Sequence, residues 1–335
     1  MQRLSGVPFA PWLLERIRAA PAIVLSTHVG PDADGLGSQL AFARAARAMG
    51  KKAVVVNEDP LPRRYRWLDP HGDIGHFDRD AGKLQHAALG LLFDTHEVAR
   101  AGRPAQWLTA HGVDVWVVDH HAVRRDLPVQ GVVATEFSSS GELVFRLLEA
   151  LRWPVDAVAA QALYAAMSFD TGSFRFLRNQ AETLRVAATL LDTGFDANPL
   201  QEALFASRPR DEVRLLGRVL AALQFAADGR IAWTALGPDI GHGLQLADDA
   251  IGETIPHLIG IEGVQIAMQL RPGRKAGEWK LSLRSKTAVR IGHVAEHFGG
   301  GGHDHAAGAT LSGEKEALAA EVLAMLVAAL AAADA

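Results

Sequence analysis

The sequence of 335 residues contains no cysteine. This absence excludes a disulfide framework, a thiol nucleophile and thiolate metal ligands. Any metal ion would therefore be bound by histidine, aspartate or glutamate side chains, and 14 histidines are present for that role.

The sequence also lacks an excess of positive charge. Its net charge of −4 argues against the broad basic surface that long duplex nucleic acid requires, whereas a small anionic ligand needs only a local positive pocket. Residues 1–20 do not resemble a signal peptide, and the apolar stretch 322–333 is shorter than the ~18–20 residues of a membrane span. We therefore expect a cytoplasmic protein with no membrane partner.

The length suits two domains, and the first half alternates short apolar runs with helical patterns. The predicted strands cover residues 22–26, 53–56, 89–93, 115–118 and 129–134. Helices are predicted at 38–49, with Ser38 as N-cap, and at 141–151 and 155–167, while 60–88 is expected to be irregular. Continuous apolar strands separated by helices predict an α/β fold with a mostly parallel sheet flanked by helices.

The pattern changes after residue 192. Helices are predicted at 200–206 and 211–226, strands at 231–235, 264–270 and 279–283, and an alanine-rich helix at 315–332. We therefore expect a catalytic domain at 1–194, a helical linker at 195–226 and a smaller C-terminal α+β domain at 227–335.

Four segments of the first domain carry oxygen and imidazole ligands, three of them directly after a predicted strand. The segments contain His28, Asp32 and Asp34; Asp94; Asp119, His120 and His121; and Asp170. Because ligands bind at the carboxyl ends of parallel strands, we expect these side chains to meet in one cleft.

The charge of such a cleft indicates what it would bind. Five aspartates brought close together repel one another, and two dications about 3.5–4 Å apart would largely cancel that repulsion. Mixed carboxylate and imidazole ligation suits Mn²⁺ better than Ca²⁺. Taken singly, Asp32 could belong to a turn and Asp94 could cap a strand, but their joint occurrence favours a metal centre.

These motifs resemble those of the DHH phosphoesterases. The matching patterns are His-x-x-x-Asp-x-Asp from His28, Asp-Thr at Asp94, Asp-His-His at 119–121 and Asp-Thr-Gly-x-Phe from Asp170. The run of glycines at 299–302, followed by His303, resembles the substrate domain associated with that family. The resemblance spans nearly the whole chain and is nearest to the compact oligoribonuclease and pAp-phosphatase type.

The resemblance implies two divalent metal ions, with Mn²⁺ expected and Mg²⁺ as the alternative. One ion would be bound by His28, Asp32 and Asp94, and the other by Asp34, Asp94, His120 and Asp170, so that Asp94 would bridge them. His121 would face the substrate, and Asp119 would orient His120. The second motif departs from the family pattern because His96 and Glu97 follow Asp94-Thr95.

The same resemblance, together with the chemistry of the residues, indicates where the substrate binds. A glycine run can form an anion-binding nest, and arginine binds phosphate bidentately. The predicted substrate residues are Arg100, Arg284, Ser285, Gly300, Gly301, Gly302 and His303.

The predicted function is hydrolysis of short oligoribonucleotides and of 3′-phosphoadenosine 5′-phosphate (pAp) by a water molecule activated by two metal ions. The enzymatic alternative is cleavage of cyclic di-AMP or its linear product pApA, and the non-enzymatic alternative is a nucleotide sensor. The glycine-rich motif argues against an inorganic pyrophosphatase. The expected partner is short RNA or a nucleotide, and the resemblance is compatible with a homodimer.

Overall fold

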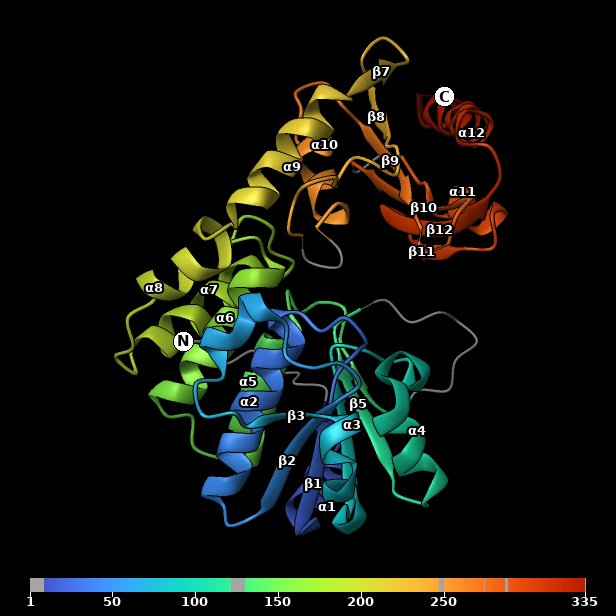
Figure 1. Ribbon diagram of the computed structural model, residues 1–335. Coiled ribbons are helices and arrows are strands. Elements are labelled where there is room, and N and C mark those ends of the chain that lie inside the picture. Colours follow the sequence, from blue (N-terminus) through green and yellow to red (C-terminus); the bar gives the residue numbers. More distant parts are fainter. Residues whose placement is uncertain (1–8, 122–129, 247–249, 274, 287–288, 335) are drawn as a thin grey trace. The chain divides into compact units, whose positions relative to one another are not determined.

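The computed structural model describes residues 9–121, 130–246, 250–273, 275–286 and 289–334, and only the backbone of His303 (Figure 1). The chain divides into two compact units, Met1–Ser207 and Arg208–Ala335. Each unit contains a six-stranded sheet and is described by itself.

The sheet of the first unit is parallel throughout, with the strand order β3-β2-β1-β4-β5-β6. Its strands are β1 (Ala22–Ser26), β2 (Lys52–Asn57), β3 (Ile74–His76), β4 (Leu89–Phe93), β5 (Val115–Asp119) and β6 (Gly131–Val133). The order reverses between β1 and β4, so loops from both halves of the sheet converge at the carboxyl ends of these two strands. The predicted α/β fold is confirmed.

Helices cover both faces of this sheet (Figure 1). The helical elements of the unit are α1 (Pro11–Ala19), α2 (Ala33–Ala48), η1 (Arg63–Leu68), α3 (Phe77–Asp80), η2 (Ala81–His86), η3 (Val98–Ala101), α4 (Gly102–Ala110), α5 (Ser140–Leu151), α6 (Ala157–Asp170), α7 (Gln180–Leu191), α8 (Asn198–Gln201) and η4 (Glu202–Ala206).

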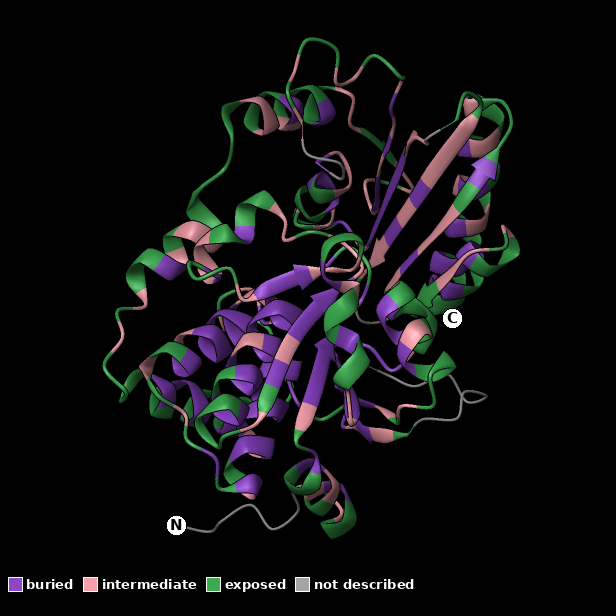
Figure 2. Ribbon diagram, turned by 60° about the horizontal axis from the view of Figure 1, so that its bottom comes forward, coloured by how far each residue is buried: buried purple, intermediate pink, exposed green. Residues whose placement is uncertain are grey.

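Successive residues of each strand point to opposite faces of the sheet. On β1, Leu25 packs in the large core with α1, α2, α5 and α6, whereas Val24 packs with Leu84 and Leu108 on the other face. The central strands are therefore buried on both sides, as Figure 2 shows. This explains why they appear in the sequence as continuous apolar runs.

Two local predictions for this unit were wrong. Helix α2 begins at Ala33, because the Asp32 side chain accepts hydrogen bonds from the N–H groups of Asp34 and Gly35 and caps the helix ahead of Ser38. The stretch 60–88, predicted as irregular, contributes the edge strand β3 and three short helices.

The second unit has a mixed sheet with the order β11-β12-β10-β9-β8-β7. Its elements are α9 (Arg210–Ala221), β7 (Gln224–Ala226), β8 (Ile231–Ala235), η5 (Gly252–Thr254), α10 (Ile255–Ile259), β9 (Ile266–Pro272), β10 (Glu278–Ser285), α11 (Gly292–His297), β11 (Gly301–His303), β12 (Ala306–Ser312) and α12 (Lys315–Asp334). Helices α11 and α12 pack on one face and α9 and α10 on the other. The predicted helix 211–226 ends early, since its last residues form β7.

The range predicted as a linker, 195–226, is divided between the two units. Leu200 of α8 packs in the core of the first unit, whereas Leu215 and Val219 of α9 pack in a core of the second. The boundaries at 194/195 and 226/227 stay a prediction.

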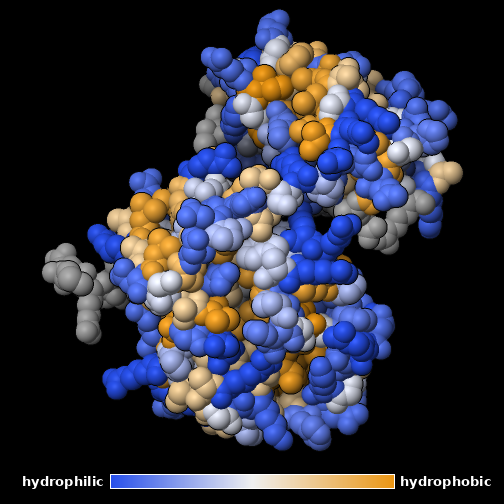
Figure 3. All heavy atoms as spheres, turned by 60° about the vertical axis from the view of Figure 1, so that its left-hand side comes forward, coloured by the Kyte–Doolittle hydropathy of each residue, from blue (hydrophilic) through white to orange (hydrophobic). Residues whose placement is uncertain are grey.

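Helix α12 is longer than predicted, with 20 residues, and is long and apolar enough to cross a membrane by length and composition alone. Its residues Val322, Leu326 and Leu330 pack against the second sheet, and 22% of its apolar window is buried. The face drawn in Figure 3 is mostly hydrophilic, with smaller hydrophobic patches. The absence of a membrane partner stays a prediction.

The contact between α2 and α6 depends on Gly37. A Cβ atom at this position would lie 2.3 Å from the Ala162 carbonyl oxygen. We predict that Gly37→Ala lowers the free energy of unfolding of the first unit by about 1–3 kcal/mol, measured by denaturant titration. Gly217→Ala is the control. Gly217 lies inside α9 of the second unit with no atom within 4 Å of its Cβ position, so this substitution should raise the free energy of unfolding of that unit by about 0.5–1 kcal/mol. Equal effects of the two substitutions would contradict this packing account.

Candidate metal centre

The six predicted metal ligands gather at the carboxyl edge of the first sheet. Their atoms form three overlapping groups, each with ligand atoms within 4.8 Å of one another: Asp94, His120 and His121; His28, Asp32 and Asp94; and Asp34, His120 and Asp170. We refer to these seven residues as the Asp/His cluster. Asp94 belongs to the first and second groups, and His120 belongs to the first and third, so the three groups adjoin one another.

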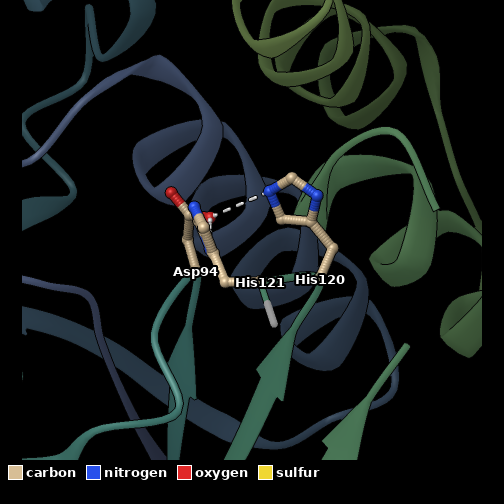
Figure 4. Close-up of side chains that lie close together, drawn as sticks. All are labelled: Asp94, His120 and His121. Atoms are coloured by element: carbon tan, nitrogen blue, oxygen red, sulfur yellow. Dashed lines mark ion pairs between the residues drawn. The ribbon is translucent and has the colours of Figure 1, made fainter. Parts of the chain in front are cut away.

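Five elements bring these side chains together. His28 follows β1, Asp32 and Asp34 lie at the start of α2, and Asp94 follows β4. His120 and His121 follow β5, and Asp170 is the last residue of α6. Figure 4 shows Asp94, His120 and His121 pointing toward one another.

His120 presents a nitrogen atom suited to a metal ion. Its Nε2 is buried without a hydrogen-bond partner among the described residues and lies 3.2 Å from Asp170, 3.6 Å from Asp94 and 3.7 Å from Asp34. Burial lowers the pKa of His120 to about 4, so the imidazole is neutral at physiological pH. A neutral imidazole with an unpaired buried nitrogen beside three carboxylates matches a metal ligand.

The carboxylates show the repulsion expected of an uncompensated cluster. Burial raises the pKa of Asp34 well above its usual value, and the charges of Asp94 and Asp170 raise it further. The pKa of Asp170 is raised to about 7, by burial first and then by Asp94 and Asp32. Divalent cations would relieve both effects, so the cluster fits the two metal ions implied by the sequence.

His28 partly offsets this negative charge. Burial alone would lower its pKa, but Asp32 and Asp94, 3.7 and 3.4 Å from its Nε2, raise it to about 10. In the protein without metal, a proton on His28 therefore occupies the place between these two carboxylates that a metal ion would take.

The prediction that Asp119 orients the His120 ring was wrong. Asp119 accepts hydrogen bonds from Nδ1 of His121 (2.8 Å) and from Nδ1 of His96 (2.6 Å), and both lower its pKa although burial raises it. Its only bond to His120 comes from the backbone N–H, and Nδ1 of the His120 ring lies 3.3 Å from the Phe137 carbonyl oxygen. Asp119 therefore orients His121, and His96 is its second partner.

The N-terminus of α5 contacts two of the carboxylates, which the sequence did not indicate. The N–H groups of Ser140 and Gly141 donate to the two oxygens of Asp34, at 2.7 and 2.8 Å. The Ser140 hydroxyl donates to Asp94 Oδ1 at 3.0 Å. The backbone hydrogen bond from Ser140 lowers the pKa of Asp34 and so opposes the larger raising effect of burial. The Ser140 hydroxyl orients the carboxylate of Asp94, which belongs to two ligand groups.

Asp94 has an unusual backbone conformation. Its φ is 61°, in the left-handed region that non-glycine residues seldom adopt, although Asp and Asn tolerate it best. The N–H of Asp94 donates to the Val118 carbonyl group at 3.1 Å. This conformation turns the chain at the end of β4 and directs the side chain toward His120 (Figure 4).

Arg100 is the one predicted substrate residue in the first unit. It lies in η3, and its carbonyl oxygen accepts a hydrogen bond from Val29, next to His28. Its exposed side chain forms no ion pair with any residue that the structure describes. The structure therefore places its backbone beside the cluster, and its substrate role stays a prediction.

The other predicted substrate residues lie in the second unit. Arg284 and Ser285 end β10, and Gly301 and Gly302 lie in β11. The N–H of Gly300 donates to the Ala295 carbonyl group, so it is already used within the chain. The His303 side chain lies outside the described residues.

A pocket of 350 Å³ lies on the face of β10 that carries Lys280 and Ser282. It is also lined by Arg271 and by Gly299, Gly300 and Gly308, so the glycines leave space that side chains would fill. Arg271 and Lys280 could not be recognised from the sequence, because a cationic residue on a strand is usually a solvated side chain.

Arg284 lies on the same face of β10, two positions beyond Ser282. Burial lowers the pKa of its guanidinium, and it forms no ion pair with a carboxylate in the described parts of the chain. A half-buried arginine without an anionic partner is suited to an anionic ligand.

Comparison with known proteins agrees with the fold and identifies the family. Residues 22–167 match the DHH family, N-terminal domain, and residues 238–331 match the DHHA1 domain. The chain is 33% identical over 297 residues to the bifunctional oligoribonuclease and PAP phosphatase NrnA of Thermus thermophilus, covering 87% of this chain and 84% of that protein.

Two further similarities are more distant. The cyclic-di-AMP phosphodiesterase PdeA of Listeria monocytogenes is 26% identical, with 87% of this chain and 45% of that protein covered. The crystal structure of an exopolyphosphatase-related protein from Bacteroides fragilis superimposes with a TM-score of 0.88 at 23% identity, covering 97% of each chain. The latter supports the fold alone.

The hydrogen bond from the Ser140 hydroxyl to Asp94 leads to a prediction about metal affinity. Ser140→Ala should weaken Mn²⁺ binding about 10- to 100-fold, because Asp94 loses the hydrogen bond that orients it while the backbone bonds to Asp34 remain. Isothermal titration of the metal-free protein measures this. Ser38→Ala is the control, since the buried Ser38 hydroxyl has no hydrogen-bond partner in the described residues. Unchanged affinity in Ser140→Ala would contradict the role of its hydroxyl.

The raised pKa values predict how the metal-free protein responds to pH. Asp170 and His28 bind protons more tightly when folded than when unfolded, so their contribution to stability is lost as pH rises through about 7 and toward about 10. Folding lowers the pKa of His120, so this residue reduces the stability of the folded protein only below its unfolded pKa of 6.5. Between pH 6.5 and 8.5, the Tm of the metal-free protein should fall, and the Tm increase on adding Mg²⁺ should grow.

The Asp170→Asn variant tests this account. It should show a shallower fall of Tm with pH than the original chain, because the group that titrates near 7 is absent. A fall of equal steepness in the two proteins would assign the pH dependence to other groups.

Proposed function

The chain belongs to the DHH family, with a DHH domain followed by a DHHA1 domain, and on this premise we propose that it is a phosphoesterase that hydrolyses short oligoribonucleotides and pAp. The observation that carries the proposal is the Asp/His cluster, in which Asp94 and His120 belong to two ligand groups each. No predicted ligand is missing, which argues against a nucleotide sensor without catalytic activity.

Two divalent cations would be held by the residues that the sequence predicted. His28, Asp32 and Asp94 form one group, and Asp34, His120 and Asp170 form another, which Asp94 adjoins through its contact with His120. When bound, such ions supply a water molecule of lowered pKa and positive charge opposite the phosphate oxygens. We propose Mn²⁺ as the ion, with Mg²⁺ as the alternative.

His121 would act directly on the substrate. Its Nδ1 contacts Asp119, which fixes the orientation of the ring, and its side chain is 28% exposed at the edge of the cluster. Asp119 and Asp94 raise the pKa of His121 although burial lowers it. A protonated imidazole at this position would donate a hydrogen bond to a phosphate oxygen or a proton to the leaving group.

The second unit would bind the distal part of the substrate. The guanidinium of Arg284, which forms no ion pair with a carboxylate of the described residues, and the pocket lined by Arg271 and Lys280 offer positive charge for a phosphate. Ser285, Gly300, Gly301, Gly302 and His303 are proposed to complete this region. We propose that residues 1–194 form the catalytic domain, 195–226 the linker and 227–335 the substrate-binding domain. We also propose that the protein is cytoplasmic.

Cleavage of cyclic di-AMP or pApA is the second candidate. The similarity to the Listeria phosphodiesterase favours it, although this chain covers less than half of that protein. The two candidates share the metal centre and differ only in the substrate held beside it.

Side-by-side assays of pAp, pApA, cyclic di-AMP and short RNA test the proposal. With Mn²⁺ or Mg²⁺ present, we expect turnover of short RNA and pAp, and Asp170→Ala should lower kcat/KM on the order of 10³-fold or more, since a metal ligand is lost. Asp192→Ala is the matched control, because Asp192 is an exposed aspartate at the end of α7. Turnover of cyclic di-AMP alone would favour the second candidate, and metal-independent turnover would refute the mechanism.

A further inference from the structure

The chain makes an unusual turn directly after the metal ligand Asp170. Gly172, Ser173 and Phe174 have φ values of 58°, 61° and 62°. Consecutive left-handed residues that are not glycine are unfavourable and persist only where other interactions hold them. Here the N–H of Ser173 donates to the Ser168 carbonyl group at 2.7 Å, and the N–H of Phe174 donates to the Thr171 hydroxyl at 2.9 Å.

This turn leaves an aromatic ring in solvent beside the cluster. Phe174 packs against Tyr164, whereas Phe176 is 74% exposed, more than any other large hydrophobic side chain that the structure describes. Phe176 lines a pocket of 440 Å³ together with Asp170, Ser138, Arg175, Leu177, Arg178 and Gln180. All of these residues belong to the first unit, and the pocket includes a metal ligand in its wall.

Arg178 fixes a positive charge in the same wall. Its Nη1 donates to the carbonyl oxygens of His120 (2.8 Å) and Thr135 (3.0 Å), and its N–H donates to the Ser138 hydroxyl. It forms no ion pair with a carboxylate anywhere in the described ranges. The backbone contacts therefore hold the guanidinium beside the cluster without neutralising its charge.

We propose that this pocket is a nucleotide subsite, in which a base stacks on Phe176 and the adjoining phosphate contacts Arg178. The inference rests on the proposed function and names the part of the first unit that holds the nucleotide next to the scissile phosphate. An exposed aromatic face beside a fixed guanidinium is the combination that binds single-stranded nucleotides irrespective of base identity. The pocket volume lies within the range of about 300–1,000 Å³ found for small-molecule sites.

The Phe176→Ala variant of the full chain tests the stacking contact. Loss of base stacking should raise KM for a dinucleotide about 5- to 100-fold and leave kcat within about threefold, because stacking is equal in the ground and transition states. Phe176→Trp keeps an aromatic ring at this position, so its KM should equal that of the original chain. With dinucleotides that lack one base, the effect of Phe176→Ala should vanish for one of the two abasic positions.

Phe225→Ala is the matched control. Phe225 is a 52% exposed phenylalanine on the edge strand β7, distant in sequence from the cluster and outside the pocket. Its substitution should leave KM unchanged for every substrate.

Arg178→Gln tests the phosphate contact separately from folding. Removing the positive charge should raise KM for pAp and for dinucleotides alike, while Mn²⁺ affinity stays equal or increases. If Arg178 served only to support the structure, loss of its two carbonyl contacts would weaken Mn²⁺ binding in parallel with activity. That parallel loss would overturn its assignment.

The outcomes separate this inference from the proposed function. If the original chain hydrolyses dinucleotides and Phe176→Ala leaves KM unchanged for all of them, the subsite is refuted and the phosphoesterase function stands. If the original chain hydrolyses none of these substrates and isothermal titration shows no binding of pAp or pApA, both proposals fall.

Discussion

The mutual repulsion of four clustered carboxylates, two of them fully buried, is the constraint on which the first unit depends. Asp32, Asp34, Asp94 and Asp170 meet at one edge of the sheet, and burial together with their charges raises the pKa of Asp34 and Asp170. Without metal the protein offsets this charge with a proton on His28 and with the N-terminus of α5. The proton and the helix N-terminus compensate only part of the negative charge of the carboxylates. The remainder would have to be compensated by bound cations.

The positions of the ligands could be predicted because they follow from topology. Once residues 22–26, 89–93 and 115–118 are recognised as apolar parallel strands, His28, Asp94 and His120 must lie at the same edge of the sheet. The position of Asp170 could not be predicted from the strands, because this residue ends a helix. Only the motif Asp-Thr-Gly-x-Phe associated it with the other residues of the cluster.

The contacts that orient these ligands could not be predicted, because they depend on the third dimension. Ser140 is 46 residues from Asp94, and no local pattern distinguishes it from an ordinary residue at a helix start. The partner of Asp119 was assigned wrongly because His120 and His121 both follow it directly and only the ring orientations decide between them. Its second partner, His96, is 23 residues away in the sequence. The exposure of Phe176 could likewise not be predicted from the sequence, because it depends on the left-handed turn before this residue.

The order of the ligands along the chain has a consequence for biosynthesis. His28 is the first of them and Asp170 the last, and α6, which ends in Asp170, packs on α2 where Gly37 allows close approach. A growing polypeptide therefore cannot assemble both centres until α6 has left the ribosome and docked. Under the proposed function, metal binding at the complete cluster therefore requires α6 to have docked on α2, and it can precede synthesis of α7, α8 and the second unit.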